Sequence, residues 1–136
     1  MNHGEHGAHG ELRDCEENLI EHVLSAAISV HRELGPGLLE SVYELALMVE
    51  LASLDIEAKR QVEIPVSYKG VNLGAGFRAD IIVAEQLVLE IKAVDELSTV
   101  HTAQIMSYLK LLGYKRGLLL NFNKKLLKEG IRRVSI

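Results

Sequence analysis

The segment that decides the fold runs from Phe77 to Lys92 and reads FRADIIVAEQLVLEIK. On either side of Ala84-Glu85-Gln86, short runs rich in Ile, Val and Leu predict two antiparallel strands joined by a tight connection. Pairing Val83 with Leu87 across this connection places apolar residues opposite one another along both strands. A shift of one residue would turn every side chain to the other face of the sheet, so this is the register we expect.

The same register brings two acidic side chains together. Asp80 falls opposite Glu90, with Cβ atoms about 4.5–5.5 Å apart, and Lys92 shares a face with Glu90 because side chains alternate along a strand. Neighbouring carboxylates repel each other unless a cation lies between them or one is protonated. Mg²⁺ is typically held by one or two carboxylates, water and substrate phosphate. These residues therefore have the parts for metal-assisted phosphodiester hydrolysis, with the Lys92 ammonium near a phosphate oxygen or the attacking water.

The alternative interpretation is an exposed hairpin that carries ordinary surface charges. Glu-x-Lys patterns are common, and the expected register also places Arg78 opposite Lys92, which is a like-charge pair. Spacing alone leaves both interpretations open.

Two helices are predicted before the hairpin, over residues 14–34 and 38–54, from apolar residues at 3.6-residue spacing. Gly35 is expected to end the first helix as a left-handed cap. Glu40 and Glu44 form a like-charge i,i+4 pair in the second helix, which a cation or solvent would relieve. The core-facing residues of this helix are predicted to be Leu39, Val42, Ala46 and Val49, with Glu40, Tyr43, Glu44 and Leu47 on the opposite side.

Strand patterns occupy residues 58–68, 71–83, 87–94, 117–122 and 131–136. Pro65 indicates an edge strand or a bulge in the first of them. A helix over 96–112, capped by Ser98 or Thr99 and ended by Gly113, follows the third strand, and residues 123–130 form a loop or short helix. This order, ααβββαβ(β), predicts an α/β or α+β fold in which helices flank both faces of a mixed sheet.

Length and composition indicate one folded domain. The chain has 136 residues, of which 48% are hydrophobic and 25% charged, as in a typical globular protein. We expect a single domain over residues 13–136 and a flexible His/Gly-rich tail over residues 1–12, either a weak metal-capturing tract or a solvated one.

No apolar run reaches membrane-spanning length, and the first ten residues do not resemble a signal peptide. The single Cys15 fits a reducing compartment, so a cytoplasmic protein is expected.

Charge is distributed unevenly along the chain. The formal net charge is −4, yet from Ile105 onward eight basic residues accompany one acid, Glu129. A basic end of this kind is a candidate phosphate-binding surface, although a solvated helix face and a basic loop explain the same pattern. The candidate nucleic-acid contacts are Lys115, Arg116, Lys124 and Lys125.

The hairpin and its surroundings resemble the PD-(D/E)XK nuclease superfamily and, within it, the small bacterial and archaeal GxxExxY proteins. The naming motif reads Gly37-Leu38-Leu39-Glu40-Ser41-Val42-Tyr43, and the core motif reads Arg78-Ala79-Asp80 followed by Leu89-Glu90-Ile91-Lys92-Ala93-Val94. The resemblance covers roughly residues 20–136 and departs at Ala79, a position where proline is common in the superfamily. Further family-like segments are His101-Thr102-Ala103-Gln104, Tyr108 and Gly117-Leu118-Leu119-Leu120-Asn121-Phe122.

This resemblance implies a restriction-endonuclease-like αβββαβ core and a metal-dependent nuclease. It implies that Asp80, Glu90 and the Ile91 carbonyl hold Mg²⁺ or Mn²⁺ and that Lys92 is the catalytic lysine. It also assigns Glu40 and Gln104 to the active site. The expected substrate is nucleic acid, DNA in preference to RNA, and a homodimer is considered. The open alternatives are a non-catalytic nucleic-acid-binding or protein-interaction module on the same fold, and a metal-dependent enzyme acting on another phosphate ester such as a nucleotide.

Overall fold

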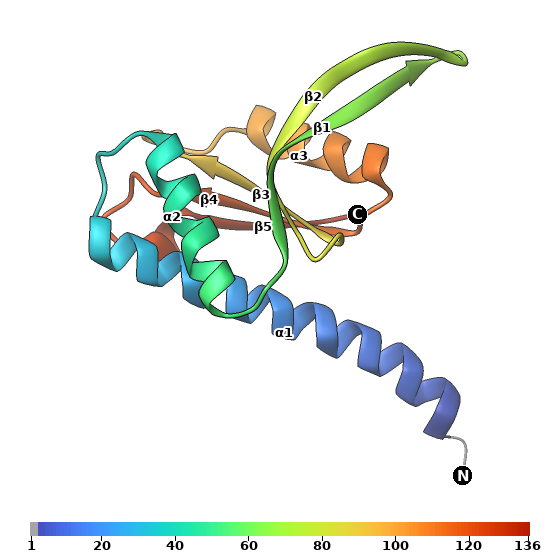
Figure 1. The fold of residues 1–136 in the computed structure, drawn as a ribbon, viewed down its shortest axis with the longest axis horizontal. Helices are drawn as coiled ribbons and strands as arrows, with labels where there is room; N and C mark the ends of the chain where they lie inside the picture. Colours follow the sequence, from blue (N-terminus) through green and yellow to red (C-terminus); the bar gives the residue numbers. More distant parts are fainter. Residues whose placement is uncertain (1–2) are drawn as a thin grey trace.

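The computed structural model describes the backbone of residues 3–136 and the side chains of residues 15–74 and 76–136. Its helices and strands follow the predicted order (Figure 1). They are α1 (His3–Leu34), α2 (Glu40–Ser53), β1 (Ala58–Tyr68), β2 (Val71–Val83), β3 (Leu87–Lys92), α3 (Thr99–Leu112), β4 (Arg116–Asn121), the 3₁₀ turn η1 (Leu127–Gly130) and β5 (Ile131–Ser135).

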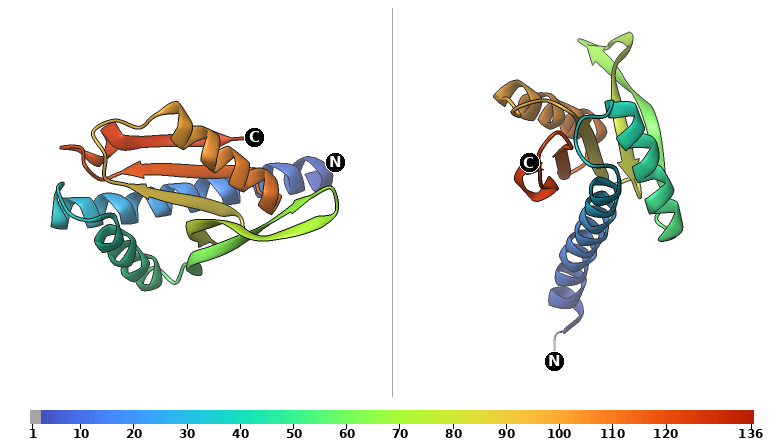
Figure 2. Two further views of the ribbon diagram at one scale, coloured as in Figure 1. Left: turned by 90° about the horizontal axis from the view of Figure 1, so that it is seen from above. Right: turned by 90° about the vertical axis from the view of Figure 1, so that its left-hand side faces the viewer.

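The strands of the described part form one five-stranded mixed sheet in the order β1-β2-β3-β4-β5. β3 and β4 are parallel and are connected through α3, whereas the other neighbours are antiparallel. α1 and α2 pack on one face of the sheet and α3 on the other, as the two views of Figure 2 show. This is the α+β arrangement that the sequence predicts for a restriction-endonuclease-like fold.

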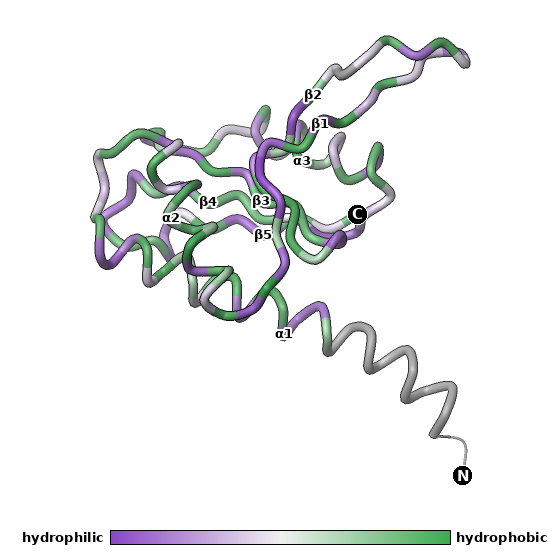
Figure 3. Tube along the Cα trace, viewed as in Figure 1, coloured by the Kyte–Doolittle hydropathy of each residue, from purple (hydrophilic) through white to green (hydrophobic). Residues whose placement is uncertain are grey.

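The central strands are buried because both of their faces are covered. Leu118, Leu119 and Leu120 of β4 are fully buried, and they contribute alternately to the core under α1 and α2 and to the core under α3. Figure 3 shows the hydrophobic residues that dominate β3 and β4. This confirms the strand predicted over residues 117–122, and a run of three leucines suits a strand that is buried on both faces.

The β1–β2 hairpin extends beyond the rest of the sheet (Figure 1). β1 is an edge strand, and its register with β2 shifts on both sides of Pro65, so both predictions made from this proline are confirmed. The β2–β3 register also agrees with the sequence analysis, since Val83 pairs with Leu87 and Ile81 with Leu89.

α1 ends as predicted but begins earlier than expected. Gly35 has a φ of 70° and its backbone N–H donates to the His31 carbonyl at 2.7 Å, which closes the last turn. The helical backbone starts at His3, within the stretch where a flexible tail is predicted. Its glycines disfavour a helix, but the segment lacks proline, which would break one. The histidine side chains of this stretch lie outside the described side chains, and the division into tail and domain stays a prediction.

The predicted core face of α2 is wrong. Leu39, Val42 and Val49 are exposed, with relative accessibilities of 74%, 39% and 70%, and Ala46 is partly buried. The buried residues lie on the side predicted to face away from the core: Tyr43, Glu44, Leu47 and Leu51. Apolar residues surround most of this helix, so hydrophobicity does not select one face. The polar groups of Tyr43 and Glu44 select it instead, because each finds hydrogen-bond partners inside the protein.

No helix in the described part of the chain combines the length and the apolar character needed to cross a membrane.

Candidate active site

β2 and β3 diverge at the point where Asp80 and Glu90 face each other. The backbone ladder between the strands ends at Ile81 and Leu89. Beyond it, two side chains take over the hydrogen bonds: the Asp80 N–H donates to Oε1 of Glu90 at 3.2 Å, and the Ile91 N–H donates to Oδ2 of Asp80 at 2.8 Å. The divergence also separates Arg78 from Lys92, and Arg78 instead pairs with Glu63 of β1 at 3.1 Å. The expected like-charge pair is therefore absent from the sheet.

A backbone N–H holds one oxygen of each carboxyl group, and the two carboxyl groups also hydrogen bond to each other, which lowers the pKa of Asp80 and raises the pKa of Glu90. Neither group forms an ion pair within the described residues. Glu90 is 4% exposed and Asp80 is partly buried. Burial, together with the charge of Asp80, raises the pKa of Glu90 to about 8, and burial likewise raises the pKa of Asp80.

Lys92 lies beside the carboxylate pair at the end of β3. Its positive charge lowers the pKa of both Asp80 and Glu90, although burial outweighs this effect. Its ammonium forms no ion pair within 4.0 Å among the described residues. The backbone around it is fixed, since the Phe122 N–H donates to the Lys92 carbonyl at 2.8 Å and the buried Asn121 amide exchanges two hydrogen bonds with Val94. The Lys92 ammonium is therefore an unpaired cation on a backbone segment that hydrogen bonds hold in place.

α3 covers the same side of the sheet as Glu90. The charges of Glu90 and Asp80, together with burial, raise the pKa of Tyr108 to about 12, so its hydroxyl stays protonated and can donate a hydrogen bond. Gln104 lies one helical turn before Tyr108 and is partly buried. His101 instead forms the capping box of α3: its Nδ1 accepts from the Ser98 N–H at 3.0 Å. The predicted caps Ser98 and Gly113 are both confirmed.

Glu40 approaches the site from the first residue of α2. Its Oε2 accepts from the Ala93 N–H at 2.8 Å, directly after Lys92 in the chain. Tyr43 holds the preceding loop: its hydroxyl donates to the Gly35 carbonyl at 2.5 Å and accepts from the Leu38 N–H at 3.1 Å. Its ring is buried and stacks on Phe122 with centroids 4.5 Å apart. The tyrosine of the GxxExxY motif thus positions the start of α2 and has a hydrogen-bonded hydroxyl, as expected of a buried tyrosine.

A cavity of about 210 Å³ opens in front of Asp80 and Ile91. Glu40 and Ser41 line it from α2, together with two residues that the predicted active site lacks, Glu44 and Gln61.

Glu44 is buried and held in place by two residues of β1. Its carboxylate accepts from Nη2 of Arg60 at 2.9 Å and from Nε2 of Gln61 at 2.6 Å, and its charge raises the pKa of Asp80. Gln61 has a φ of 54°, a left-handed conformation inside a strand. In the sequence, only its spacing from Glu40 pointed to a role for Glu44 in the site. Its contacts with Arg60 and Gln61 could not be predicted, because they join separate elements.

The donor set of the carboxylate pair fits a hard divalent cation. Two acidic side chains lie side by side, hydrogen bonded to each other, and Ile91, which lines the cavity together with Asp80, supplies a backbone carbonyl. Oxygen donors of this type suit Mg²⁺ or Mn²⁺. No group of three or more His, Cys, Asp or Glu side chains arranged for a metal occurs among the described residues, so water and substrate would have to complete the coordination.

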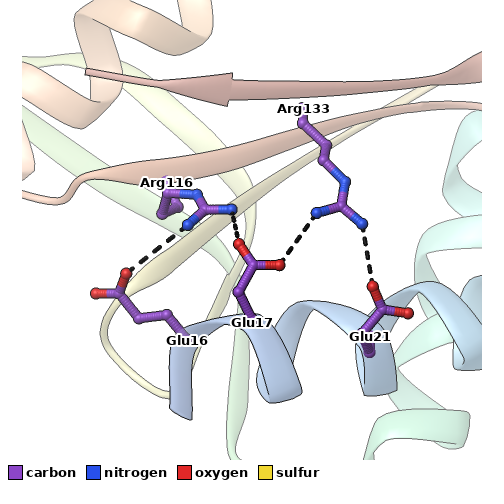
Figure 4. Close-up of polar contacts among 5 residues, drawn as sticks. All are labelled: Glu16, Glu17, Glu21, Arg116 and Arg133. Atoms are coloured by element: carbon purple, nitrogen blue, oxygen red, sulfur yellow. Dashed lines mark hydrogen bonds and ion pairs between the residues drawn. The ribbon is translucent and has the colours of Figure 1, made fainter. Parts of the chain in front are cut away.

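The predicted nucleic-acid contacts lie at the two ends of β4, Lys115 and Arg116 at its start and Lys124 and Lys125 after its end. Arg116 lies at the start of β4, five residues or about 16 Å along the sheet from the level of Lys92. It pairs with Glu17 of α1 at 2.5 Å, and Arg133 joins Glu17 to Glu21, which fastens α1 to the sheet (Figure 4). Lys124 pairs with Glu96 at 2.6 Å. Lys115 and Lys125 are exposed and form no ion pair within the described residues.

Comparison with known proteins identifies the family. The sequence model of the PD-(D/E)XK nuclease superfamily matches residues 17–134. No curated protein and no solved structure matches the chain.

Proposed function

Because the chain belongs to the PD-(D/E)XK nuclease superfamily, we propose that it is a metal-dependent nuclease that hydrolyses phosphodiester bonds in nucleic acid. The observation that carries this proposal is the arrangement of Asp80 and Glu90. A backbone N–H of the opposite strand fixes one oxygen of each carboxyl group, and the two groups hydrogen bond to each other beside an unpaired Lys92.

In this proposal, Asp80, Glu90 and the Ile91 carbonyl hold Mg²⁺ or Mn²⁺. The bound ion supplies Lewis acidity to the phosphate and lowers the pKa of a water molecule. Lys92 binds a nonbridging phosphate oxygen and stabilises the negative charge that develops during hydrolysis. Glu40 lines the cavity in front of Asp80 and can orient water there. Gln104 is assigned to the rim of the site, one turn from Tyr108.

Two alternatives have different experimental signatures. A nucleic-acid-binding or interaction module on this fold would bind without cleaving, and an enzyme for smaller phosphate esters would act on nucleotides. The close pair of carboxyl groups supports a catalytic role, since a buried Glu90 beside a partly buried Asp80 is costly for an inactive module when no cation binds between them. DNA as the preferred substrate, membership of the GxxExxY group, a homodimer and a cytoplasmic location remain predictions.

The test is cleavage of supercoiled plasmid, single-stranded DNA and RNA in the presence of Mg²⁺ or Mn²⁺. We expect nicking that EDTA abolishes and that is lost in Asp80→Asn, Glu90→Gln and Lys92→Met. The amide variants keep the oxygens that accept from the Asp80 and Ile91 N–H groups, so the hairpin remains folded. Lys110→Met, at an exposed position in the last turn of α3, is the matched control and should cleave normally. Binding without cleavage would favour the non-catalytic module.

A further inference from the structure

A second cavity, of about 520 Å³, lies between the last turns of α1, the α1–α2 loop and residues 125–128. Ile28, Pro36 and Leu126 form apolar parts of its wall. Arg32, Lys125 and Lys128 line it as well. Its volume is within the range of about 300–1,000 Å³ that small-molecule and nucleotide sites occupy.

The charge of this cavity is entirely positive, because no acidic residue lines it. The side chains of Arg32, Lys125 and Lys128 form no ion pair or hydrogen bond within the described residues. The nearby acid Glu129 lines a different cavity together with Arg132. Most other arginines whose side chains the structure describes form ion pairs with acids, as Arg116 and Arg133 do with α1 (Figure 4). Three unneutralised cations around one hollow indicate an anionic ligand.

The walls of the cavity are held by buried contacts. His31 is 7% exposed, and its Nε2 lies 2.8 Å from the Lys124 carbonyl, which ties the segment carrying Lys125 to α1. Leu127 is buried in the core beneath. The C-terminal end of α1 adds a partial charge of about −0.5, but three full positive charges outweigh it.

We propose that this cavity binds the phosphomonoester of a nucleotide, at the end of a nucleic-acid strand or in a free nucleotide. A phosphomonoester carries a charge of about −2 at neutral pH, compared with −1 for each diester of a chain, so three cations favour it. The apolar wall accommodates the sugar or base. The nucleotide class of the ligand rests on the proposed nuclease function, whereas the cavity and its charge do not.

This assignment has a functional consequence. Hydrolysis of a phosphodiester creates a new phosphomonoester end, so the cavity would recognise an end that cleavage produces. Pro36 lines the cavity and belongs to the loop that leads into Glu40 of the candidate active site. The two sites therefore share one structural element, whose conformation Tyr43 fixes through Gly35 and Leu38.

The experiment measures binding to the Asp80→Asn protein, which prevents cleavage. Oligonucleotides of one sequence carry a 5′-phosphate, a 3′-phosphate or no terminal phosphate, and a nucleoside monophosphate serves as competitor. We expect one phosphorylated end to bind about tenfold more tightly than the unphosphorylated strand, as one additional charge-assisted contact gives. Arg32→Gln and Lys128→Gln should each weaken that binding without changing affinity for the unphosphorylated strand, whereas Lys110→Gln should change neither.

Competition by the nucleoside monophosphate at comparable concentration would identify free nucleotides as the ligand, and its failure to compete would identify strand ends. Equal affinity for phosphorylated and unphosphorylated strands would overturn the proposal. So would a phosphate preference that survives in the combined Arg32→Gln, Lys125→Gln, Lys128→Gln variant. Cleavage by the wild-type protein is scored separately: phosphate preference without cleavage refutes the nuclease function alone, and cleavage without phosphate preference refutes this inference alone.

Discussion

The backbone N–H of Asp80 donates to Oε1 of Glu90 at 3.2 Å, so one candidate metal ligand is held by the main chain of the other. The hydrogen bonds that join β2 to β3 at this point therefore also fix the geometry of the site. An Ala variant at either position would remove a hydrogen bond of the hairpin together with a carboxylate. Amide variants remove the charge and keep an acceptor, which separates catalysis from folding.

Without metal, Glu90→Gln should make the protein more stable at pH 8. The folded protein retains a proton on Glu90, whose pKa is raised from 4.5 to about 8, whereas the unfolded chain releases it. The folded state then binds more protons between these values, so wild-type stability falls as pH rises through this window, by roughly 1 kcal/mol per pH unit. The variant lacks this titration. Urea unfolding from pH 5 to 8.5 measures both slopes, and parallel slopes would contradict the assignment.

Divalent metal should stabilise the wild-type protein selectively. A ligand that binds only the folded state at a hundred times its Kd raises the free energy of unfolding by about 2.7 kcal/mol. We expect Mg²⁺ or Mn²⁺ to raise the melting temperature of the wild type at pH 8 and to leave Asp80→Asn nearly unchanged. An equal rise in both proteins would mean that the ion binds elsewhere.

Lys92→Met should abolish cleavage while metal binding persists. The long apolar side chain replaces the stem of the lysine and removes only the cation, which forms no ion pair within the described residues. Loss of one charged group that stabilises a transition state lowers kcat about 10²–10³-fold. Single-turnover cleavage measures this loss, with calorimetric titration of Mn²⁺ as the companion readout. Unchanged kcat would remove Lys92 from the mechanism.

Tyr43→Phe should destabilise the protein by about 1–3 kcal/mol, because the variant leaves the Gly35 carbonyl and Leu38 N–H without their partner. The phenylalanine keeps the stacking on Phe122, so the packing term is unchanged. Tyr114→Phe is the matched control, since the Tyr114 hydroxyl forms no hydrogen bond within the described residues. Urea unfolding measures both. Equal losses of stability would show that the Tyr43 hydroxyl does not fix the loop.

Gln61→Gly should be more stable than Gln61→Ala by about 1 kcal/mol. Both variants lose the hydrogen bond to Glu44, but only glycine adopts the φ of 54° without a steric penalty. A difference of the opposite sign would show that Gln61 adopts another backbone conformation in solution.

The strands and their register could be predicted from the sequence because the signals are local. The turn at Lys69-Gly70 and the cap at Gly35 mark ends of elements, and matching apolar residues across residues 84–86 allows a single register. The adjacency of Asp80 and Glu90 followed from that register alone.

The remaining features depend on contacts between separate elements. The buried side of α2 was set by the partners of Tyr43 and Glu44, which lie in the preceding loop and in β1. The divergence of β2 from β3 could not be predicted from the alternation of side chains along the strands, because a register based on that pattern assumes that the strands stay paired. Arg116 appeared to be a free cation, but α1 brings Glu17 to it across the fold.

The central claim, that Asp80 and Glu90 together hold a divalent cation, is tested most directly by anomalous diffraction from crystals soaked in Mn²⁺. The account predicts one strong anomalous peak within coordination distance of Oδ1 of Asp80 and Oε2 of Glu90, absent from crystals of Asp80→Asn. A structure in which these two oxygens face different sides of the sheet, or in which Mn²⁺ binds only at other residues, would contradict it.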